Sequence, residues 1–458
     1  MSDRKMSAPN SRRMRFIKAS AGVLALAIAA SLFFAASAYA RHRSTDRGGA
    51  SSGPRLTRDL NGSVPAHDGE RVRLSTELGS VVVRSQNTDK VDYRIHLETD
   101  SSQKGAQQLL KSFTVSVRQT ADGIVLEADA PGHRWTGRLW ATLELNVPKN
   151  VNLDVSTGGG NIDASAILGH VTLSTAGGNI TAGTIGGPAR LETGGGNIVA
   201  TSVGGELYAT TGGGHIVVGS VGSNATLRTS GGHIRVASIR GTAHLDTGGG
   251  NITLGHSGAE LTASTDGGEI QVGEAAGLVR AKTGGGGIRV VRMVGPTDLE
   301  TGGGSIYLTQ VDSPVKASTS AGGITAWFVA PSKSSGKCEL QSNAGDIVVH
   351  LPRELPITVD AQVDDGDSNF VIVDPAFPLK VTHGDPSTGA HAVVHAYGAL
   401  NGGGELLRLR TVAGNIRFVL SDADKQVELY KQQMAQLQKQ TEELQQQLMR
   451  QGSQDDGP

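Results

Sequence analysis

The sequence has few of the residues on which most folded domains depend. Its 458 residues include one cysteine, which excludes a disulfide framework and a cysteine-ligated zinc cluster. Aromatic residues make up 4% of the chain, which is thin for a conventional core of this length. The 15 prolines and the irregular spacing of the glycines exclude a collagen-like triple helix.

Basic charge is also scarce once the N-terminus is set aside. The formal net charge of the chain is −1, from 42 Lys and Arg against 43 Asp and Glu. The first 40 residues hold six of the basic residues and one aspartate, so the rest of the chain has 36 basic against 42 acidic residues and a charge near −6. That sign is wrong for a dedicated nucleic-acid-binding protein.

The first 40 residues have the features of an export signal. A basic region around Arg12 and Arg13 precedes an apolar stretch over residues 19–36. Ala38-Tyr39-Ala40 then matches the small-x-small pattern of a signal-peptidase site. We therefore expect a signal peptide over residues 1–40 that is cleaved after Ala40. An uncleaved membrane anchor is the alternative, because the stretch has about the 20 residues that a membrane span needs.

Glycine is abundant, with 64 residues, and many of the glycines belong to an internal repeat. Ten threonines stand 18 residues apart without an insertion, and an isoleucine follows each by five positions. The threonines are Thr157, Thr175, Thr193, Thr211, Thr229, Thr247, Thr265, Thr283, Thr301 and Thr319. A glycine-rich turn separates threonine from isoleucine, as in residues 193–198. Ten copies in phase predict a repeat architecture.

Apolar residues alternate within each copy, which is typical of strands. Counted from the threonine, the inward-facing positions are −4, −2, +5, +7 and +10. In one copy they are Ala189, Leu191, Ile198, Ala200 and Val203. One copy cannot bury its own apolar side, whereas stacked copies can. The sequence therefore predicts an all-β fold, a single-stranded β-helix or β-solenoid with 18-residue coils.

The C-terminal tail departs from this pattern. From residue 427 the apolar positions follow a 3-4 spacing over three heptads, and glutamine dominates the positions between them. The apolar positions are Val427, Tyr430, Met434, Leu437, Thr441, Leu444 and Leu448. We expect a C-terminal α-helical (coiled-coil) tail. It either pairs with the same helix of another chain, which the spacing favours, or lies along the solenoid.

These patterns divide the chain into seven segments. We expect the signal peptide (1–40), a flexible linker (41–69), an N-terminal β cap region (70–150), the regular solenoid (151–328), degenerate coils with a C-terminal cap (329–420), the coiled-coil helix (421–451) and a disordered tail (452–458). The cap region contains one expected helical stretch near residues 103–112. The linker is inferred from its content of Arg, Ser, Gly and Asp.

Short motifs at both ends of the array resemble a known family. Leu145-Asn146-Val147-Pro148 and Gly160-Asn161-Ile162 look like the opening of a bacterial putative-adhesin family. Gly345-Asp346-Ile347 and Gly414-Asn415-Ile416 resemble its closing coils. The family is a domain of unknown function, a repeat β-solenoid, and the resemblance covers residues 70–420. It implies an exported protein of the cell envelope and implies no activity.

Two polar columns of the repeat are expected to be structural. The threonines share the parity of the apolar −2 and −4 positions, which turns them inward or into the corner and argues against an ice-binding face. The +4 column contains asparagines, which hydrogen-bond along a stack of turns, and the adjacent His215 and His233. Two histidines without a third ligand make a weak metal site.

No residue set in the sequence amounts to a catalytic or ligand site. Calcium-binding turns need an aspartate in each repeat, and only Asp266 lies in a turn. The outward positions show no paired column of acids, as a polysaccharide lyase or hydrolase would need. Cys338 falls at a −4 position and is expected to be a buried small hydrophobe. We predict no catalytic, cofactor-binding or metal-binding residues, and no cofactor.

The expected function is that of a non-enzymatic exported β-solenoid, a putative adhesin or a cell-envelope scaffold or interaction protein. The alternatives are a carbohydrate-active β-helix enzyme and a periplasmic partner in envelope stress or signalling. The expected partner is a protein or glycan of the cell surface or envelope, not a nucleic acid, with homo-oligomers forming through the tail helix. Membrane contact is expected only if the N-terminal segment stays uncleaved. The expected location is the periplasm, the cell surface or the medium.

Overall fold

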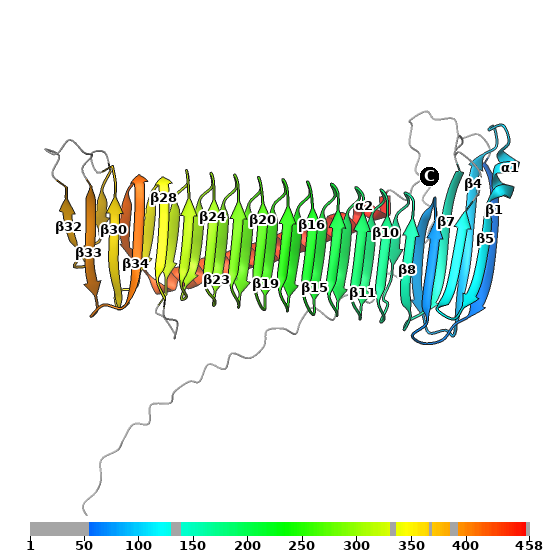
Figure 1. The fold of residues 1–458 in the computed structure, drawn as a ribbon, viewed down its shortest axis with the longest axis horizontal. Coiled ribbons are helices and arrows are strands. Elements are labelled where there is room, and N and C mark those ends of the chain that lie inside the picture. Colours follow the sequence, from blue (N-terminus) through cyan, green and yellow to red (C-terminus); the bar gives the residue numbers. More distant parts are fainter. Residues whose placement is uncertain (1–54, 130–138, 330–335, 366–368, 385–392, 455–458) are drawn as a thin grey trace, which may run out of the picture. The chain divides into compact units, whose positions relative to one another are not determined.

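Each copy of the repeat contributes one strand to each of two sheets, as its alternating apolar residues predict (Figure 1). The structure is a computed structural model that describes residues 55–129, 139–329, 336–365, 369–384 and 393–454. The chain divides into residues 1–51 and 52–458, and all described residues belong to the second unit. The expected signal peptide and its cleavage site lie outside the described residues.

The strands that precede the glycine turns form the centre of one sheet, which we call sheet B. They are β8 (Asn152–Thr157), β10 (Val171–Thr175), β12 (Ala189–Thr193), β14 (Leu207–Thr211), β16 (Ala225–Thr229), β18 (Ala243–Thr247), β20 (Leu261–Thr265), β22 (Val279–Thr283), β24 (Thr297–Thr301) and β26 (Val315–Thr319). Neighbours pair in parallel, with Leu191 opposite Ala209, so large and small side chains face each other in adjoining coils.

The strands that follow the turns form the centre of sheet A. They are β9 (Ile162–Ala164), β11 (Ile180–Ile185), β13 (Ile198–Val203), β15 (Ile216–Val221), β17 (Ile234–Ile239), β19 (Ile252–Ser257), β21 (Ile270–Ala275), β23 (Ile288–Met293), β25 (Ile306–Val311) and β27 (Ile324–Phe328). Their pairing is also parallel, with Ile198 opposite Ile216, 18 residues further along the chain. Isoleucine therefore lies on isoleucine through the ten coils of the array.

Both ends of the stack contain a coil that is out of sequence order. At the N-terminal end, β2 (Arg71–Thr76) and β3 (Ser80–Gln86) lie between the array and a later coil, β6 (Gly123–Asp129) and β7 (Leu139–Pro148). Antiparallel strands complete this end: β4 (Lys90–Asp100) and β1 (Arg55–Pro65) in sheet A, and β5 (Thr114–Thr120) in sheet B. Helix α1 (Ala106–Ser112) contacts β4 and β1.

The C-terminal end repeats this arrangement in reverse. After β28 (Cys338–Ala344) and β29 (Ile347–Leu351), the next coil in space is β34 (Glu405–Ala413) and β35 (Ile416–Leu420). The earlier coil, β30 (Ile357–Val363) and β31 (Val371–Val373), lies outside it. The antiparallel strands β33 (Val394–Leu400) and β32 (Lys380–His383) follow in sheet B. The antiparallel strands shield the parallel coils, whose exposed edges would otherwise pair with other chains.

The core lies between the two sheets and has the composition that the repeat predicts. The isoleucines at +5 are 0–1% exposed, and Leu191, Ala200 and Val203 are equally buried. One continuous cluster of buried aliphatics runs through the stack. Burial of each large aliphatic contributes about 1.5–3 kcal/mol, which offsets the loss of chain entropy in a glycine-rich sequence.

The prediction of a flexible linker over residues 41–69 is wrong for residues 55–65. Residues Arg55–Pro65 form β1, which pairs along its whole length with β4. Leu56, Leu60 and Val64 alternate along this strand and pack against the core. The polar residues between them suggested disorder, but they face away from the core, and pairing with a distant strand decides the conformation.

Helix α2 (Ala423–Gln454) lies along the outer face of sheet A and runs obliquely across the strands from β25 toward β13 (Figure 1). At about 1.5 Å per residue its 32 residues extend about 48 Å, close to ten coils at about 4.8 Å each. The expected disordered tail begins at 452, whereas the helix continues to Gln454. Of the two arrangements expected for the tail, the structure shows the one along the solenoid.

Candidate functional site

The threonine column ties each turn to the coil before it. Thr211 Oγ1 donates a hydrogen bond to the carbonyl of Gly196 at 2.7 Å and accepts one from the amide of Gly214 at 3.2 Å. The same pair of bonds recurs from Thr175 to Thr319. All ten threonines are at most 5% exposed. The column is structural, as predicted, and presents no ice-binding face.

The +4 column forms a second ladder, in which each side chain accepts a hydrogen bond from the backbone amide one coil further on. Asn197 Oδ1 accepts from the amide of His215, His215 Nδ1 from that of His233, and His233 Nδ1 from that of Asn251, at 2.8–2.9 Å. Asn161, Asn179 and Asn251 take the same part elsewhere in the column. Histidine therefore replaces asparagine in this ladder without interrupting it.

These bonds decide the tautomer of both imidazoles. A ring nitrogen that accepts an N–H bond carries no proton, so neutral His215 and His233 carry theirs on Nε2. The two rings stack with centroids 4.9 Å apart and an interplanar angle of 4°. Nε2 of a neutral ring in this tautomer has no free lone pair for a metal. The geometry therefore makes the pair two parallel N–H donors.

Arg235 follows this pair on β17 and points outward from sheet A. Burial, and then the positive charge of Arg235, lower the pKa of His215. The same two causes, followed by the charge of His215, lower the pKa of His233. The Arg235 side chain is half-buried, and within the described part of the chain its Nη1 is buried without a hydrogen-bond partner.

The outer face of sheet B carries rows of polar and charged side chains. Arg280 Nη1 lies 2.5 Å from Glu260 Oε1, and Lys282 Nζ lies 3.1 Å from Glu300 Oε1. Further along, the Arg190 guanidinium lies over the ring of Tyr208, 4.4 Å from its centroid. From β12 to β26, the outward residues at −3 and −1 are all half-buried or exposed. This face is therefore an accessible surface of mixed charge.

The outer face of sheet A is different because α2 covers part of it. Several outward-facing residues beneath the helix are less than 5% exposed: Val199, Val217, Thr253, Val291 and Thr309. Gln426 Nε2 donates to the carbonyl of Thr309 at 2.9 Å, and Thr309 Oγ1 donates to Gln433 Oε1 at 2.7 Å. A Cβ on Gly273 would lie 3.1 Å from Met434 Sδ, so glycine here lets the helix approach closely.

The apolar residues expected to form one stripe on the tail helix differ in their burial. Leu437 is 5% exposed against the solenoid, whereas Val427 is 47% exposed. The side chains of Thr441, Leu444 and Leu448 lie outside the described residues. Pairing of this helix with that of another chain stays a prediction.

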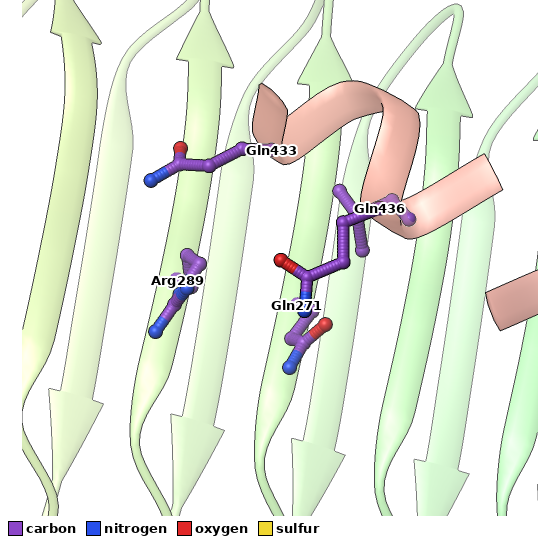
Figure 2. A pocket seen from close by; sticks show the side chains of 5 residues that line it. Gln271, Arg289, Gln433 and Gln436 are labelled. Carbon is purple, nitrogen blue, oxygen red and sulfur yellow. The ribbon is translucent and has the colours of Figure 1, made fainter. Parts of the chain in front are cut away.

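A small polar cavity lies between α2 and sheet A. Its lining consists of Gln271, Arg289, Gln433, Gln436 and Leu437, and it holds about 20 Å³, room for a single water molecule. Figure 2 shows the amide and guanidinium groups of the four polar residues around this gap. Its size excludes an organic substrate and makes it a feature of the helix interface.

A polar cluster at the C-terminal end was not anticipated from the sequence. Asp360 on β30 accepts from His395 at 2.9 Å and from Arg408 at 3.2 Å. Burial works against ionisation, but these two hydrogen bonds hold the pKa of Asp360 below its ordinary value. The three residues are far apart in sequence, and only the out-of-order pairing of β30, β33 and β34 brings them together.

Cys338, which the sequence also singled out, lies in the core. Cys338 is 8% exposed, and burial raises the pKa of its thiol, in agreement with the predicted hydrophobic role. No group of three or more His, Cys, Asp or Glu side chains in the described ranges could hold a metal ion. Within the same ranges, no helix is both long and apolar enough to cross a membrane.

Fold and surfaces together define a nearly all-β repeat protein with long parallel strand stacks and one surface helix. Its family is known: the chain belongs to the Toastrack DUF4097 family, whose pattern matches residues 70–376. That family is a domain of unknown function, and the predicted resemblance to a repeat β-solenoid family is confirmed. A search of curated proteins found no match.

Three solved structures are among the similar ones. A putative cell adhesion protein from Clostridium sporogenes is 10% identical, covers 80% of this chain and 100% of its own, and has a TM-score of 0.16. A putative adhesin from Bacteroides fragilis is 15% identical over 56% of this chain and 97% of its own, with a TM-score of 0.22. One from Parabacteroides distasonis is 10% identical over 62% and 97%, with a TM-score of 0.23. At these scores the likeness carries no argument about this chain.

Proposed function

We propose that this chain is a non-enzymatic, adhesin-like interaction protein of the cell envelope or surface that binds its partner through the outer face of sheet B. The observation that carries the proposal is the contrast between the two faces. Helix α2 covers part of the outer face of sheet A and buries several of its outward residues, whereas the outward residues of sheet B are half-buried or exposed from β12 to β26. A long flat face suits a large partner better than a small substrate.

The chemistry of the face supports a protein or glycan partner. Its ion pairs are solvent-exposed and contribute little to stability, so they are free to be exchanged for contacts with a partner. Arg190 over Tyr208 adds an aromatic surface of the kind that is enriched in binding sites. The mixed sign of the charges does not favour a nucleic acid.

Export is part of the proposal and is supported by the N-terminal sequence. The basic region, the apolar stretch and Ala38-Tyr39-Ala40 are the features that a secretion signal requires. When the full chain is expressed, we expect to find the processed protein in the periplasm, on the outer surface or in the medium. Its N-terminus should be residue 41. A protein found only in the cytoplasm would contradict it.

The sheet B surface is tested with charge reversals matched between the two faces. Arg280→Glu reverses one exposed cation of sheet B, where Arg280 pairs with Glu260, and Arg292→Glu reverses one of sheet A, where Arg292 pairs with Glu274 at 3.0 Å. Binding to envelope extracts and to a glycan array should fall for the first variant and persist for the second. Equal binding by both variants and the wild type would exclude sheet B as the surface.

A carbohydrate-active enzyme is the second candidate, and the Asp360 cluster is the observation in its favour. Asp360 and His395 form a hydrogen-bonded acid–base pair on the surface. Incubation of the full chain with acidic and neutral polysaccharides, followed by reducing-end and unsaturated-product assays, should show no turnover. Turnover that is lost in Asp360→Asn would replace the adhesin-like proposal with this one.

A further inference from the structure

We propose that His215, His233 and Arg235 form a binding site for an oxyanion, and that the ligand which carries this group is an acidic glycan. The site lies on the turn edge of the solenoid beside sheet A. It is separate from the sheet B surface and goes beyond the proposed adhesin-like function.

The two imidazoles supply hydrogen-bond donors and nothing else. Nδ1 of each ring is occupied by a backbone amide, at 2.9 Å for His215 and 2.8 Å for His233. The proton is therefore on Nε2. Within the part of the chain that the structure describes, neither Nε2 has a hydrogen-bond partner, and neither is among the buried atoms without one. Both N–H groups are thus available to an acceptor from solvent.

Stacking holds the two donors in register. The rings are parallel to within 4° with centroids 4.9 Å apart, so their N–H groups are offset by about one strand spacing. Both side chains are half-buried, and the backbone bonds restrict their rotation. A pair of restricted donors loses little conformational entropy when an anion binds.

Arg235 supplies the charge. The outward positions beside it on the neighbouring strands are Val217 and Thr253, which are uncharged and are both buried on the part of sheet A that α2 covers. Among the described residues Arg235 makes no ion pair, and its Nη1 is buried without a hydrogen-bond partner. Arg235 stands two residues after His233, and Ile234 between them is buried in the core, so His233 and Arg235 lie on the outer side of the same strand end. A half-buried cation beside two N–H donors, without an acceptor, is complementary to a carboxylate, sulfate or phosphate group.

The surroundings indicate a linear polymer. Each asparagine of the +4 column uses its Oδ1 in the ladder and so leaves its amide N–H groups as donors, at Asn179 and Asn197 on one side of the pair and Asn251 on the other. The row repeats about every 4.8 Å. Beside it the exposed turn residues Gly213 and Gly231 carry no side chain that would block an approaching chain.

The row of donors favours a glycan over a nucleic acid. A sugar polymer presents hydroxyl and carboxylate acceptors at short, regular intervals, which suits uncharged donors with one cation. Nucleic acids bind mainly through many Lys and Arg contacts to phosphates, and this edge has a single arginine at the histidine pair. Glu269 ends the column on one side and limits the row of amide donors to the coils before it.

The test uses the full chain and variants that keep the ladder. Arg235→Thr introduces the residue found at the same position in the next coil. His215→Asp with His233→Asp removes both donors but keeps an acceptor, since Asp346 Oδ1 accepts the amide of Asn415 in this way at 2.8 Å. Asn161→Asp is the control for a carboxylate in the same column. It adds one negative charge, where the double variant adds two, and lies three coils from His215, about 14 Å and beyond the Debye length at physiological salt.

Binding is measured by calorimetry with sodium sulfate, an oligogalacturonate and a single-stranded DNA of similar charge, at fixed ionic strength. We expect the oligogalacturonate to bind most tightly, and Arg235→Thr and the double aspartate variant each to weaken it about tenfold or more, the equivalent of about 1.4 kcal/mol. Asn161→Asp should bind like the wild type. Thermal melts of every variant report folding, and Arg235→Thr keeps the test decisive if the aspartates destabilise the ladder.

Three results would overturn the proposal. If the wild type bound neither sulfate nor oligogalacturonate, there would be no oxyanion site. If Arg235→Thr bound oligogalacturonate as tightly as the wild type, Arg235 and its charge would not be part of the site. Sulfate or DNA binding that equals or exceeds oligogalacturonate binding would show that the acidic glycan is the wrong ligand.

Discussion

The backbone amide of His233 donates a 2.9 Å hydrogen bond to Nδ1 of His215, its counterpart one coil away. This contact replaces the asparagine bond of other coils with one that exists only while the imidazole is neutral. Protonation of Nδ1 would set two N–H groups against each other. The stability of these coils is therefore linked to pH.

Stability should fall on acidification because of these two histidines. Burial and the Arg235 charge lower the pKa of His215 and His233 in the folded state, so below about pH 6.5 the unfolded chain binds more protons. The contribution is fully present above that pH and is lost as the pH falls toward the lowered folded-state value. Denaturant unfolding from pH 8 to 5 should show a steeper loss for the wild type than for His215→Asn with His233→Asn.

His350 provides the control for this comparison. Burial lowers its pKa as well, so it adds an acid-dependent loss that both proteins share. Only the difference between wild type and the double asparagine variant belongs to the ladder. Parallel stability curves for the two proteins would show that the Nδ1 bonds do not couple folding to pH.

Neighbouring glycines of one turn should respond in opposite ways to alanine. A Cβ on Gly196 would lie 2.0 Å from the carbonyl oxygen of Gly178, whereas a Cβ on Gly195 would meet nothing within 4 Å. Gly195 is not among the glycines with positive φ, and Ala321 stands at its position in the last coil. Gly195→Ala should be neutral or stabilise by about 0.4–1 kcal/mol, through reduced entropy of the unfolded chain.

Gly196→Ala should destabilise by more than the ~1–3 kcal/mol of an overpacked core, because backbone must move to relieve the contact. Thermal melts of the two variants compare them directly. Equal melting temperatures would mean that the coils are not spaced as closely as the structure shows.

The threonine column should depend on its hydroxyl rather than its shape. Thr211→Val keeps the volume but removes the bonds to Gly196 and Gly214, and should cost about 1–3 kcal/mol because buried backbone groups lose a partner. Thr211→Ser should cost less, since Ser342 Oγ makes the equivalent bond to Gly322 at 2.9 Å. Denaturant titration orders the three proteins, and a valine variant as stable as wild type would contradict this role.

The docking of α2 should fail when charge is placed beneath it. Val217 is fully buried on the outer face of sheet A, so Val217→Asp should release the helix, with faster amide exchange in residues 423–454. Thr181→Asp is the matched control at the equivalent position of β11, where the side chain is half-buried. Helix protection unchanged in Val217→Asp would show that α2 is not held on this face.

Release of the helix also tests self-association. The exposed Val427 and the seam period favour pairing with a second copy, whereas the buried Leu437 favours the solenoid. Light scattering of the full chain and of a chain truncated after Asp422 should give a higher mass for the former if pairing occurs. A monomer in both cases would leave α2 as an intramolecular element.

Sequence alone was enough to determine the array. Its unit is local, 18 residues with a fixed order of apolar positions, and every coil packs on an equivalent neighbour. The alternation of apolar residues in one copy was therefore enough to predict which side chains are buried in all copies. The inward positions, the structural threonines and the buried Cys338 followed directly from that periodicity. The 3-4 spacing of apolar residues in the tail also predicted its helix.

Outside the repeat, only the tertiary structure decided which strands pair and which side chains are in contact. The strand over residues 55–65, the out-of-order coils and the Asp360–His395–Arg408 cluster all depend on pairing between segments that carry no shared period. A stripe of apolar residues on α2 fits another helix or a sheet, and small outward residues such as Gly273 allow it to settle on sheet A. The chemistry of His215 and His233 likewise came from which atom each backbone amide reaches, a distance that no one-dimensional pattern contains.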